Sequence, residues 1–503
     1  MSTTTGSSHA LMMGSIMLAT VMYTLDSTIA AVALPHMQGT FSAAQDQVAW
    51  VLTSYIVSSA IMTPMAGYLS DRIGRRRLFL LSVIGFILTS MACGLAMNLE
   101  EMVVFRVLQG MFGAPLIPLA QAAILDAYTP ATYGRGMALF GVGVMLGPII
   151  GPTLGGWLTE YLNWRWVFFI NLPVGIVALA GVLASIQDRP EEDRERPFDL
   201  AGFAYLALGI GALQLMLDRG NTLSWFESIE IRVEALVAVL CLYLFVVQIL
   251  TRDRPFIDPV IFRNRNFSFS LLVSFVVGFN LLATMAILPP LMQNLLGYPV
   301  LTTGWILAPR GVGTMVSMSL VGRLVEKIDP RLLIVFGLAC MAVSLWQMAG
   351  FDRNVTPAML IHTGLLQGFG MGFTFVPMST MAFSTLPPRY RPDASGFYSL
   401  SRNIGSSVGI SVLMGALAVY YRTNREALVP HVNVFTLPFE ETAKIPLLDP
   451  GSTQGLAMLD GLVRQEALML GYLDDFRLMM VITLAAIPLV FLLRPLRREA
   501  AAA

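Results

Sequence analysis

The sequence predicts an all-α integral membrane protein, built from two pseudo-symmetric six-helix bundles plus two inserted helices, with fourteen transmembrane helices in all. Its 503 residues are 55% hydrophobic and only 13% charged, whereas a soluble domain carries about a quarter charged residues. Apolar runs of about twenty residues, the length of a membrane-spanning helix, recur from Leu11 almost to Arg494. The distribution of basic residues and an internal repeat then determine how these runs are ordered.

The apolar runs give fourteen predicted spans. They are residues 11–33, 48–69, 78–97, 101–125, 134–158, 166–186, 198–217, 232–251, 268–292, 301–323, 331–350, 357–382, 394–420 and 474–494. With the N-terminus placed inside, the inner loops and the C-terminal tail hold twenty Lys and Arg residues. The short outer loops hold three, Arg165, Arg219 and Arg353. Because short cytoplasmic loops are enriched in Lys and Arg, both termini are predicted to be cytoplasmic.

An internal repeat divides the chain. The run from Gly322 to Arg331 repeats the glycine, leucine, acidic, basic and isoleucine positions of the run that begins at Gly67. A parallel repeat of this kind is typical of two homologous bundles. We therefore predict an N-terminal six-helix bundle (1–186), a cytoplasmic linker with an inserted helix pair (187–266, the pair being 198–217 and 232–251) and a C-terminal bundle (267–503) with an outer loop at 421–473.

Asp26 is the one acidic residue predicted to lie well inside a span, and ionisable residues there are costly and functional by default. At 1.5 Å per residue it lies roughly 10 Å deep, and Arg106 in the fourth span lies roughly 8 Å deep from the same side. Opposite charges at one depth relieve each other's burial. Burial favours the neutral form of Asp26 and the cation favours the charged form, which suits a proton-binding switch. The alternatives are a structural carboxylate held by Ser27 and Thr28, and a structural arginine bonded to backbone carbonyls.

The run from Gly67 to Arg77 contains four arginines and two glycines between apolar spans. Its pattern, G-x-x-x-D-R-x-G-R-R, resembles the loop between the second and third spans of the major facilitator superfamily. The resemblance implies a latch at the cytoplasmic mouth, in which Asp71 faces the N-terminal end of the thirteenth span near Ala394. A simple positive anchor for the loop is the alternative. The residues of this predicted latch motif are Gly67, Asp71, Arg72, Gly74, Arg75 and Arg76.

The fifth span has glycines at a spacing of four residues, which make a smooth face for close helix packing, and two prolines that favour a bend. The run Gly143-Val-Met-Leu-Gly147-Pro148-Ile-Ile-Gly151-Pro152 resembles the antiporter motif of the superfamily's exporters. Ordinary packing of small residues is the alternative. Arg106 itself begins a run that resembles the fourth-span motif, R-x-x-Q-G, whose arginine the family ties to proton coupling.

Two further runs, Leu25–Pro35 and Asn163–Gly175, resemble motifs of the fourteen-span drug:proton antiporters of the EmrB/QacA type. The end of the chain is similar to the EmrB-type branch. This resemblance implies a proton-coupled exporter of hydrophobic or amphipathic compounds in the inner membrane, without a cofactor, working with a periplasmic adaptor protein and an outer-membrane channel. Residues 455–470 place apolar side chains on one helical face. They fit a surface helix or a hairpin that contacts the adaptor, or a lid over the bundle.

Other functional classes fit less well. An exporter of one metabolite or siderophore is the first alternative, and a non-transporting membrane receptor or scaffold is the second. No nucleic-acid partner is predicted. The four histidines, His9, His36, His362 and His431, are too far apart for a metal site, and His362 is interpreted as a packed residue. An enzyme is not predicted because the sequence has no nucleophile–base pair. Arg310 and Arg402 are further intramembrane charges and are candidates for the cavity wall.

Overall fold

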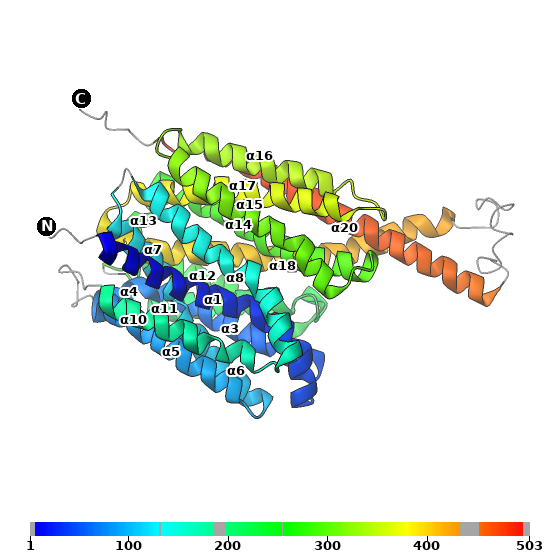
Figure 1. The fold of residues 1–503 in the computed structure, drawn as a ribbon, viewed down its shortest axis with the longest axis horizontal. Helices are drawn as coiled ribbons and strands as arrows, with labels where there is room; N and C mark the ends of the chain where they lie inside the picture. The colour runs from blue at the N-terminus through cyan, green and yellow to red at the C-terminus, as the bar shows by residue number, and fades with distance from the viewer. Residues whose placement is uncertain (1–5, 130–131, 186–197, 254, 432–451, 496–503) are drawn as a thin grey trace.

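The computed structural model describes residues 6–129, 132–185, 198–253, 255–431 and 452–495, in which every regular element is a helix (Figure 1). The principal helices are α1 (Gly6–Phe41), α3 (Trp50–Met62), α4 (Met65–Ile73), α5 (Arg75–Leu95), α6 (Leu99–Gly113), α7 (Leu116–Ala127), α8 (Tyr133–Tyr161), α9 (Trp166–Phe169), α10 (Asn171–Ser185), α11 (Leu200–Arg219), α12 (Ile229–Thr251), α14 (Arg265–Pro290), α15 (Val300–Leu324), α16 (Pro330–Met348), α17 (Pro357–Ser384), α18 (Arg391–Leu428) and α20 (Thr453–Phe491). Short helical turns lie between them: α2 (Gln45–Val48), η1 (Trp225–Glu227), α13 (Val260–Arg263), η2 (Leu291–Leu295), η3 (Pro388–Tyr390) and η4 (Val429–His431).

In the part of the chain that the structure describes, eleven helical segments are long and apolar enough to cross a membrane. The other three predicted spans correspond to α3 with α4, to α15 and to α20. The helix of the second span ends at Met62, just before Pro64, because proline cannot donate the next helical hydrogen bond. Arg310 and Arg323 make α15 less apolar, and acidic residues at 474 and 475 do the same for α20.

The segment predicted as an outer loop at 421–473 is largely helical where it is described. The thirteenth helix continues to Leu428 and the last helix already begins at Thr453, twenty-one residues before the predicted span. The apolar pattern ends at the membrane surface. The helices continue beyond it into water, where contacts between their side chains stabilise them. Arg425 pairs with Asp460 at 2.8 Å across the two helices. They form a hairpin that projects beyond the bundles (Figure 1), so the interpretation of a lid over the bundle is wrong.

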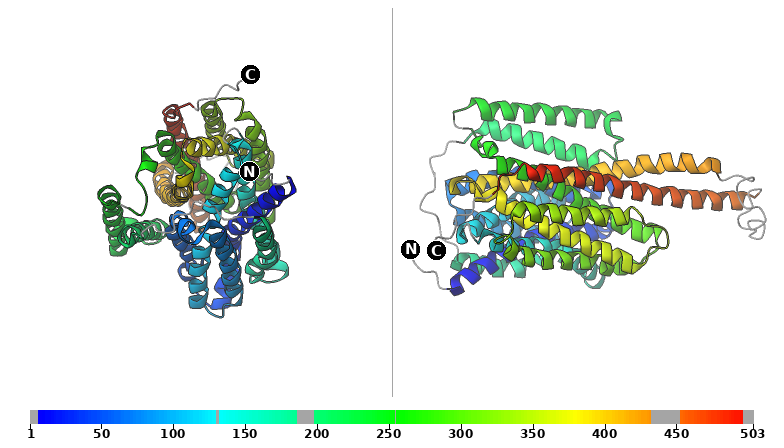
Figure 2. Two further views of the ribbon diagram at one scale, coloured as in Figure 1. Left: turned by 90° about the vertical axis from the view of Figure 1, so that its left-hand side faces the viewer. Right: turned by 90° about the horizontal axis from the view of Figure 1, so that it is seen from above.

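The helices pack as two groups with an inserted pair at the flank (Figure 2). In the first group, α1 packs on α8 and α10, and α3 packs on α6. In the second, α15 packs on α17, and α14 and α20 pack on α18. Between them in sequence, α11 contacts both α3 and α18, while α12 packs mainly on α11. The inserted pair therefore lies beside the two groups and extends neither core.

The molecule has two distinct ends. We call the end where α1 begins and α20 finishes the terminal end, and the opposite end the hairpin end (Figure 1). Among the described residues, the hydrogen bonds that join the two bundles directly lie at the terminal end. They link Ser395 to the Pro118 carbonyl at 3.1 Å, Arg391 to Asp126 at 3.2 Å and Arg135 to Glu326 at 2.8 Å. The bundles are thus fastened to each other at this end.

Candidate functional site

The Asp26 carboxylate lies at the centre of a polar cluster inside the first bundle, and its side chain is fully buried. Arg106 donates to its Oδ2 at 2.7 Å. Gln109 and Asn171 each donate from a side-chain amide to its Oδ1 at 2.9 Å. Hydrogen bonds to a carboxylate stabilise its charged form. The structure therefore places together the pair that the sequence predicted and adds two amide donors.

Arg106 is held on several sides. Its Nε donates to the Val51 carbonyl at 2.9 Å, and its Nη1 also reaches Gln109 at 2.8 Å. Its guanidinium lies 4.0 Å from the centre of the Tyr55 ring, a favourable cation–π arrangement. The alternative of an arginine bonded to backbone carbonyls is thus correct in part, because Arg106 binds both the Val51 carbonyl and Asp26. Such fixation orients the guanidinium for one carboxylate.

Ser27 and Thr28 do not bind the Asp26 carboxylate, so these two hydroxyls are not the partners that the structural alternative named. Their hydroxyls donate to backbone carbonyls of their own helix, and Thr28 also reaches the Gly147 carbonyl of α8 at 3.3 Å. The residues of this cluster that sequence reasoning missed are Gln109 and Asn171. Both were visible as amides inside apolar runs, and Gln109 follows Arg106 by three residues, which places the two side chains on one helix face.

The glycines of α8 bring it against α1 next to Asp26. A Cβ atom on Gly147 would lie 2.3 Å from Thr24 Oγ1 and 2.5 Å from the Leu25 backbone nitrogen. One on Gly151 would lie 2.3 Å from Thr28 Oγ1. Pro148 and Pro152 lie inside the continuous helix α8. This contact fixes the turn of α1 that carries Asp26. A movement of this turn would therefore displace α8.

We predict that Gly147→Ala destabilises the protein by about 1–3 kcal/mol, the usual cost of overpacking, because the added methyl group displaces the turn of α1 that carries Asp26. Gly143→Ala is the matched control. A Cβ there would meet Met17 at 3.5 Å, an ordinary contact, so its melting temperature should stay at the wild-type value. Thermal unfolding of the two purified variants checks this, and equal melting temperatures would contradict it.

The latch motif lies at the terminal end, where α4 packs on the start of α18. A Cβ on Gly67 would lie 1.8 Å from Asp393 Oδ1, so this approach requires glycine. Gly74 ends α4 with a φ of +92°, a conformation that other residues rarely adopt. Arg76 donates to the Leu183 carbonyl at 3.0 Å, and Arg72 is exposed.

Asp126 at the end of α7 is an acid that joins both bundles, and sequence reasoning missed it. It pairs with Arg75 of the motif and, at 3.2 Å, with Arg391 at the start of α18. These side chains are largely buried, with 10–14% of their surface exposed. A border acid has no special sequence signal, so its role becomes visible only when α18 is placed against α7.

We predict that Asp126→Asn loosens the terminal end. Loss of about 1 kcal/mol of pairing raises the open population about fivefold. The reaction rate of a maleimide with a buried Ser395→Cys thiol measures this opening. The control is Arg135→Ala, since Arg135 is 58% exposed in its pair with Glu326 and should change the rate little. An unchanged rate in Asp126→Asn would contradict the proposed latch.

Arg310 and Arg402 are buried in the second bundle at neighbouring levels of α14. Arg310 donates to the Leu281 carbonyl at 3.4 Å, and the backbone of Arg402 lies against Gly278. The Arg402 guanidinium lies 5.8 Å from the centre of the Phe375 ring. Neither arginine pairs with a carboxylate in the described residues. Two positive charges are therefore left uncompensated in the core of this bundle.

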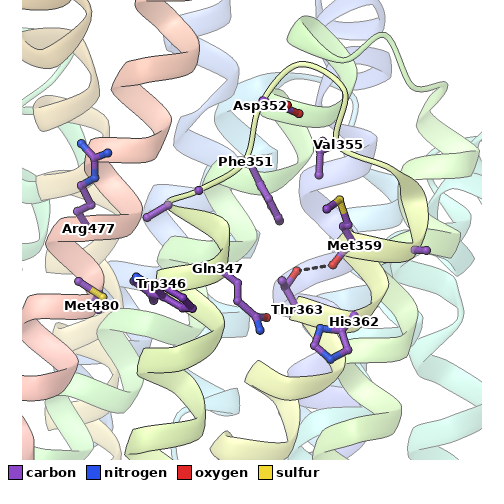
Figure 3. A pocket seen from close by; sticks show the side chains of 13 residues that line it. Trp346, Gln347, Phe351, Asp352, Val355, Met359, His362, Thr363, Arg477 and Met480 are labelled. Carbon is purple, nitrogen blue, oxygen red and sulfur yellow. Dashed lines mark hydrogen bonds between the residues drawn. The ribbon is translucent and has the colours of Figure 1, made fainter.

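A pocket of about 920 Å³ opens at the hairpin end between α16, α17 and α20 (Figure 3). His362 lines it together with Trp346, Asp352 and Arg477. The histidine is exposed, so its interpretation as a packed residue is wrong. In the described part of the chain, no group of three His, Cys, Asp or Glu side chains could hold a metal ion.

The family model described as Major Facilitator Superfamily matches residues 16–410. The chain belongs to the Major Facilitator Superfamily. It is 36% identical over 424 residues to the "Multidrug export protein EmrB" of Escherichia coli strain K12, which covers 84% of this chain and 82% of that protein. It is 33% identical over 483 residues to the "Fatty acid resistance protein FarB" of Neisseria gonorrhoeae, covering 96% and 95%. These relatives confirm the predicted superfamily and its EmrB-type branch.

Solved structures of superfamily members share the fold. The proton:xylose symporter XylE superposes with a TM-score of 0.62 at 14% identity, covering 96% of each chain. The human organic anion transporter MFSD10 gives 0.61 at 15% identity, covering 94% of this chain and 99% of that one. The predicted fold class is therefore confirmed.

Proposed function

We propose that this superfamily member is a proton-coupled exporter of hydrophobic and amphipathic compounds that works by alternating access. The observation that carries the proposal is the fully buried Asp26 carboxylate, held by Arg106, Gln109 and Asn171. A proton on Asp26 would cancel its charge and weaken the 2.7 Å bond to Arg106. The same carboxyl would thus have two stable arrangements, one charged and one neutral.

The packing offers a route from Asp26 to the other bundle. The turn of α1 that carries Asp26 contacts α8 at Gly147. Further along, α8 packs on α15 of the second bundle, where Gly311 lies against Ile149 and Gly141 against Met318. Small residues at an interface let the two backbones approach closely, so a shift of α8 would be passed directly to α15. Protonation of Asp26 would therefore change how α8 meets α15.

The orientation supports outward release. With the termini inside the cell, as the basic residues predict, the fastened terminal end is the cytoplasmic mouth and the hairpin faces outward. The latch at Asp126 and Arg391 would open when the site turns inward. A proton crossing about 150 mV supplies about 3.5 kcal/mol, enough for a concentration ratio of a few hundredfold. The projecting hairpin offers a helical surface to an adaptor protein, as expected for the EmrB-type branch.

Substrates with a negative head group belong to the proposed range, because Arg310 and Arg402 leave two buried positive charges without a carboxylate among the described residues. The name of the relative FarB refers to fatty acids, which have this chemistry. Thirty methionines and twenty-nine phenylalanines offer adaptable apolar surface for the rest of such molecules.

A transport assay in proteoliposomes with an imposed pH gradient tests the proposal. The panel contains ethidium, the neutral dye N-phenyl-1-naphthylamine and a fluorescent fatty acid. We expect several of them to be pumped and the gradient to be dissipated as they move. Transport of a single member would favour a specific exporter of one metabolite. Binding without gradient-driven flux of any member would favour a receptor or scaffold and overturn the proposal.

A further inference from the structure

A second buried carboxyl lies in the other bundle. Asp475 in α20 is fully buried, and neither of its oxygen atoms has a hydrogen-bond partner in the described residues. Its neighbour Asp474 is different, since it is partly exposed and accepts hydrogen bonds from Asn424 and Arg477 at 3.2 and 2.8 Å. Two adjacent acids thus have opposite environments.

The packing of α20 shows where Asp475 points. Residues four apart share a helix face. One turn earlier, Gly471 lies against Leu417 of α18, and two turns later Thr483 donates to Asn280 of α14 at 3.3 Å. Asp475 therefore faces the interior of the second bundle, between α18 and α14, at the hairpin end.

The elements around Asp475 provide no paired cation. The parts of α14 and α16 that reach the hairpin end contain no acidic or basic side chain. The nearest basic residue of α15 is Arg310, which lies deeper in the bundle. On α18, Arg425 is paired with Asp460, and Arg422 is exposed. On α20, Arg477 lines the pocket of Figure 3 and pairs with Asp474, while Tyr472 is the other ionisable neighbour. Asp352 also lines that pocket.

An ionised carboxylate without hydrogen bonds or a counter-charge is strongly disfavoured away from water. A protonated carboxyl loses the charge and with it most of this cost. We infer that Asp475 carries a proton in this conformation and forms a second proton-binding site of the transporter. Asp475 lies at the hairpin end, where the adjacent Asp474 is partly exposed, so water is close to the site.

The protonation of Asp475 does not depend on the proposed function. Its role in transport rests on the proposed proton-coupled function. Asp26 and Asp475 lie in different bundles and share no hydrogen-bond partner in the part of the chain that the structure describes. If α20 moves relative to α14 and α18 within its bundle during the transport cycle, water reaches Asp475 and its proton leaves. One transport cycle would then carry two protons, one on each bundle.

Difference infrared spectroscopy of the full chain in lipid vesicles, titrated from acid to alkaline pH, tests the site without any substrate. We expect the wild type to show a protonated-carboxyl band that is lost as the pH rises. Asp475→Asn should lack this component at every pH, whereas the control Asp474→Asn should keep it. Asp26→Asn should lose a different component, which keeps the two sites apart.

Two results would overturn the inference. If Asp475→Asn keeps every carboxyl band, Asp475 is already ionised in the wild type. If the component is present but does not respond to pH, the proton is permanently bound and the residue is structural. Where the variant folds poorly, the wild-type titration alone decides the second case. The proton-to-substrate ratio in vesicles then gives a separate readout, and it should fall from two to one in Asp475→Asn.

Discussion

Asp26→Asn is expected to reduce proton-driven export by at least about 100-fold, the low end of what a positioned proton-transfer group contributes. The amide has the shape of the neutral carboxyl and can still accept the bond that Arg106 donates at 2.7 Å in the wild type. It cannot release a proton, so the cluster stays in one of its two arrangements. Substrate exchange across vesicles without a pH gradient should continue, because it needs no change of protonation.

The measurement is dye accumulation in inside-out vesicles energised by a pH gradient, compared with exchange of preloaded dye in the same preparation. Asp474→Asn serves as the control. In the described part of the chain this partly exposed acid bonds Asn424 and Arg477, so its substitution should leave both rates unchanged. Full gradient-driven accumulation by Asp26→Asn would rule out this residue as the coupling site. Loss of both rates would indicate damage to the fold instead.

Sequence reasoning could place Asp26 and Arg106 together because charge burial is costly enough to leave a signal in any apolar span. Equal depth in two spans then made them partners. Amide side chains cost less to bury, so Gln109 and Asn171 stayed unnoticed although they complete the cluster. The ion pair was predictable from the sequence, whereas the two amides that complete the hydrogen bonding of its carboxylate were not.

The terminal end shows a second reason for the gap. The motif around Gly67 indicated a latch, but Asp126, which bridges the bundles there, lies 59 residues further along the chain at a span border. Its partner Arg391 looked like one more cytoplasmic charge. At the hairpin end, hydropathy located only the membrane-spanning part of the last helix. The helix itself already begins at Thr453. The burial of Asp475 depends on that longer helix and could not be inferred before it.

Arg106→Gln is expected to destabilise the protein by about 3–5 kcal/mol, the cost of breaking a buried ion pair from one side. The substitution removes the donor to Asp26, the bond to the Val51 carbonyl and the stacking on Tyr55. Asp26 can escape part of the cost by binding a proton, so the loss of stability should be small in acid and grow as the pH rises. Melting temperatures of the detergent-purified protein across pH measure this.

The double variant Asp26→Asn/Arg106→Gln separates charge from packing. It leaves no unpaired buried charge, so it should recover most of the melting temperature and lose the pH dependence while remaining inactive in export. Arg106→Lys should fall between the single variant and the wild type, because an ammonium keeps the charge but cannot bind Asp26, Gln109 and the Val51 carbonyl in the fixed geometry of a guanidinium. If Arg106→Gln has the melting temperature of the wild type at every pH, Arg106 does not stabilise the Asp26 carboxylate. The two-arrangement model of the cluster would then fail, since protonation of Asp26 would have no partner to release.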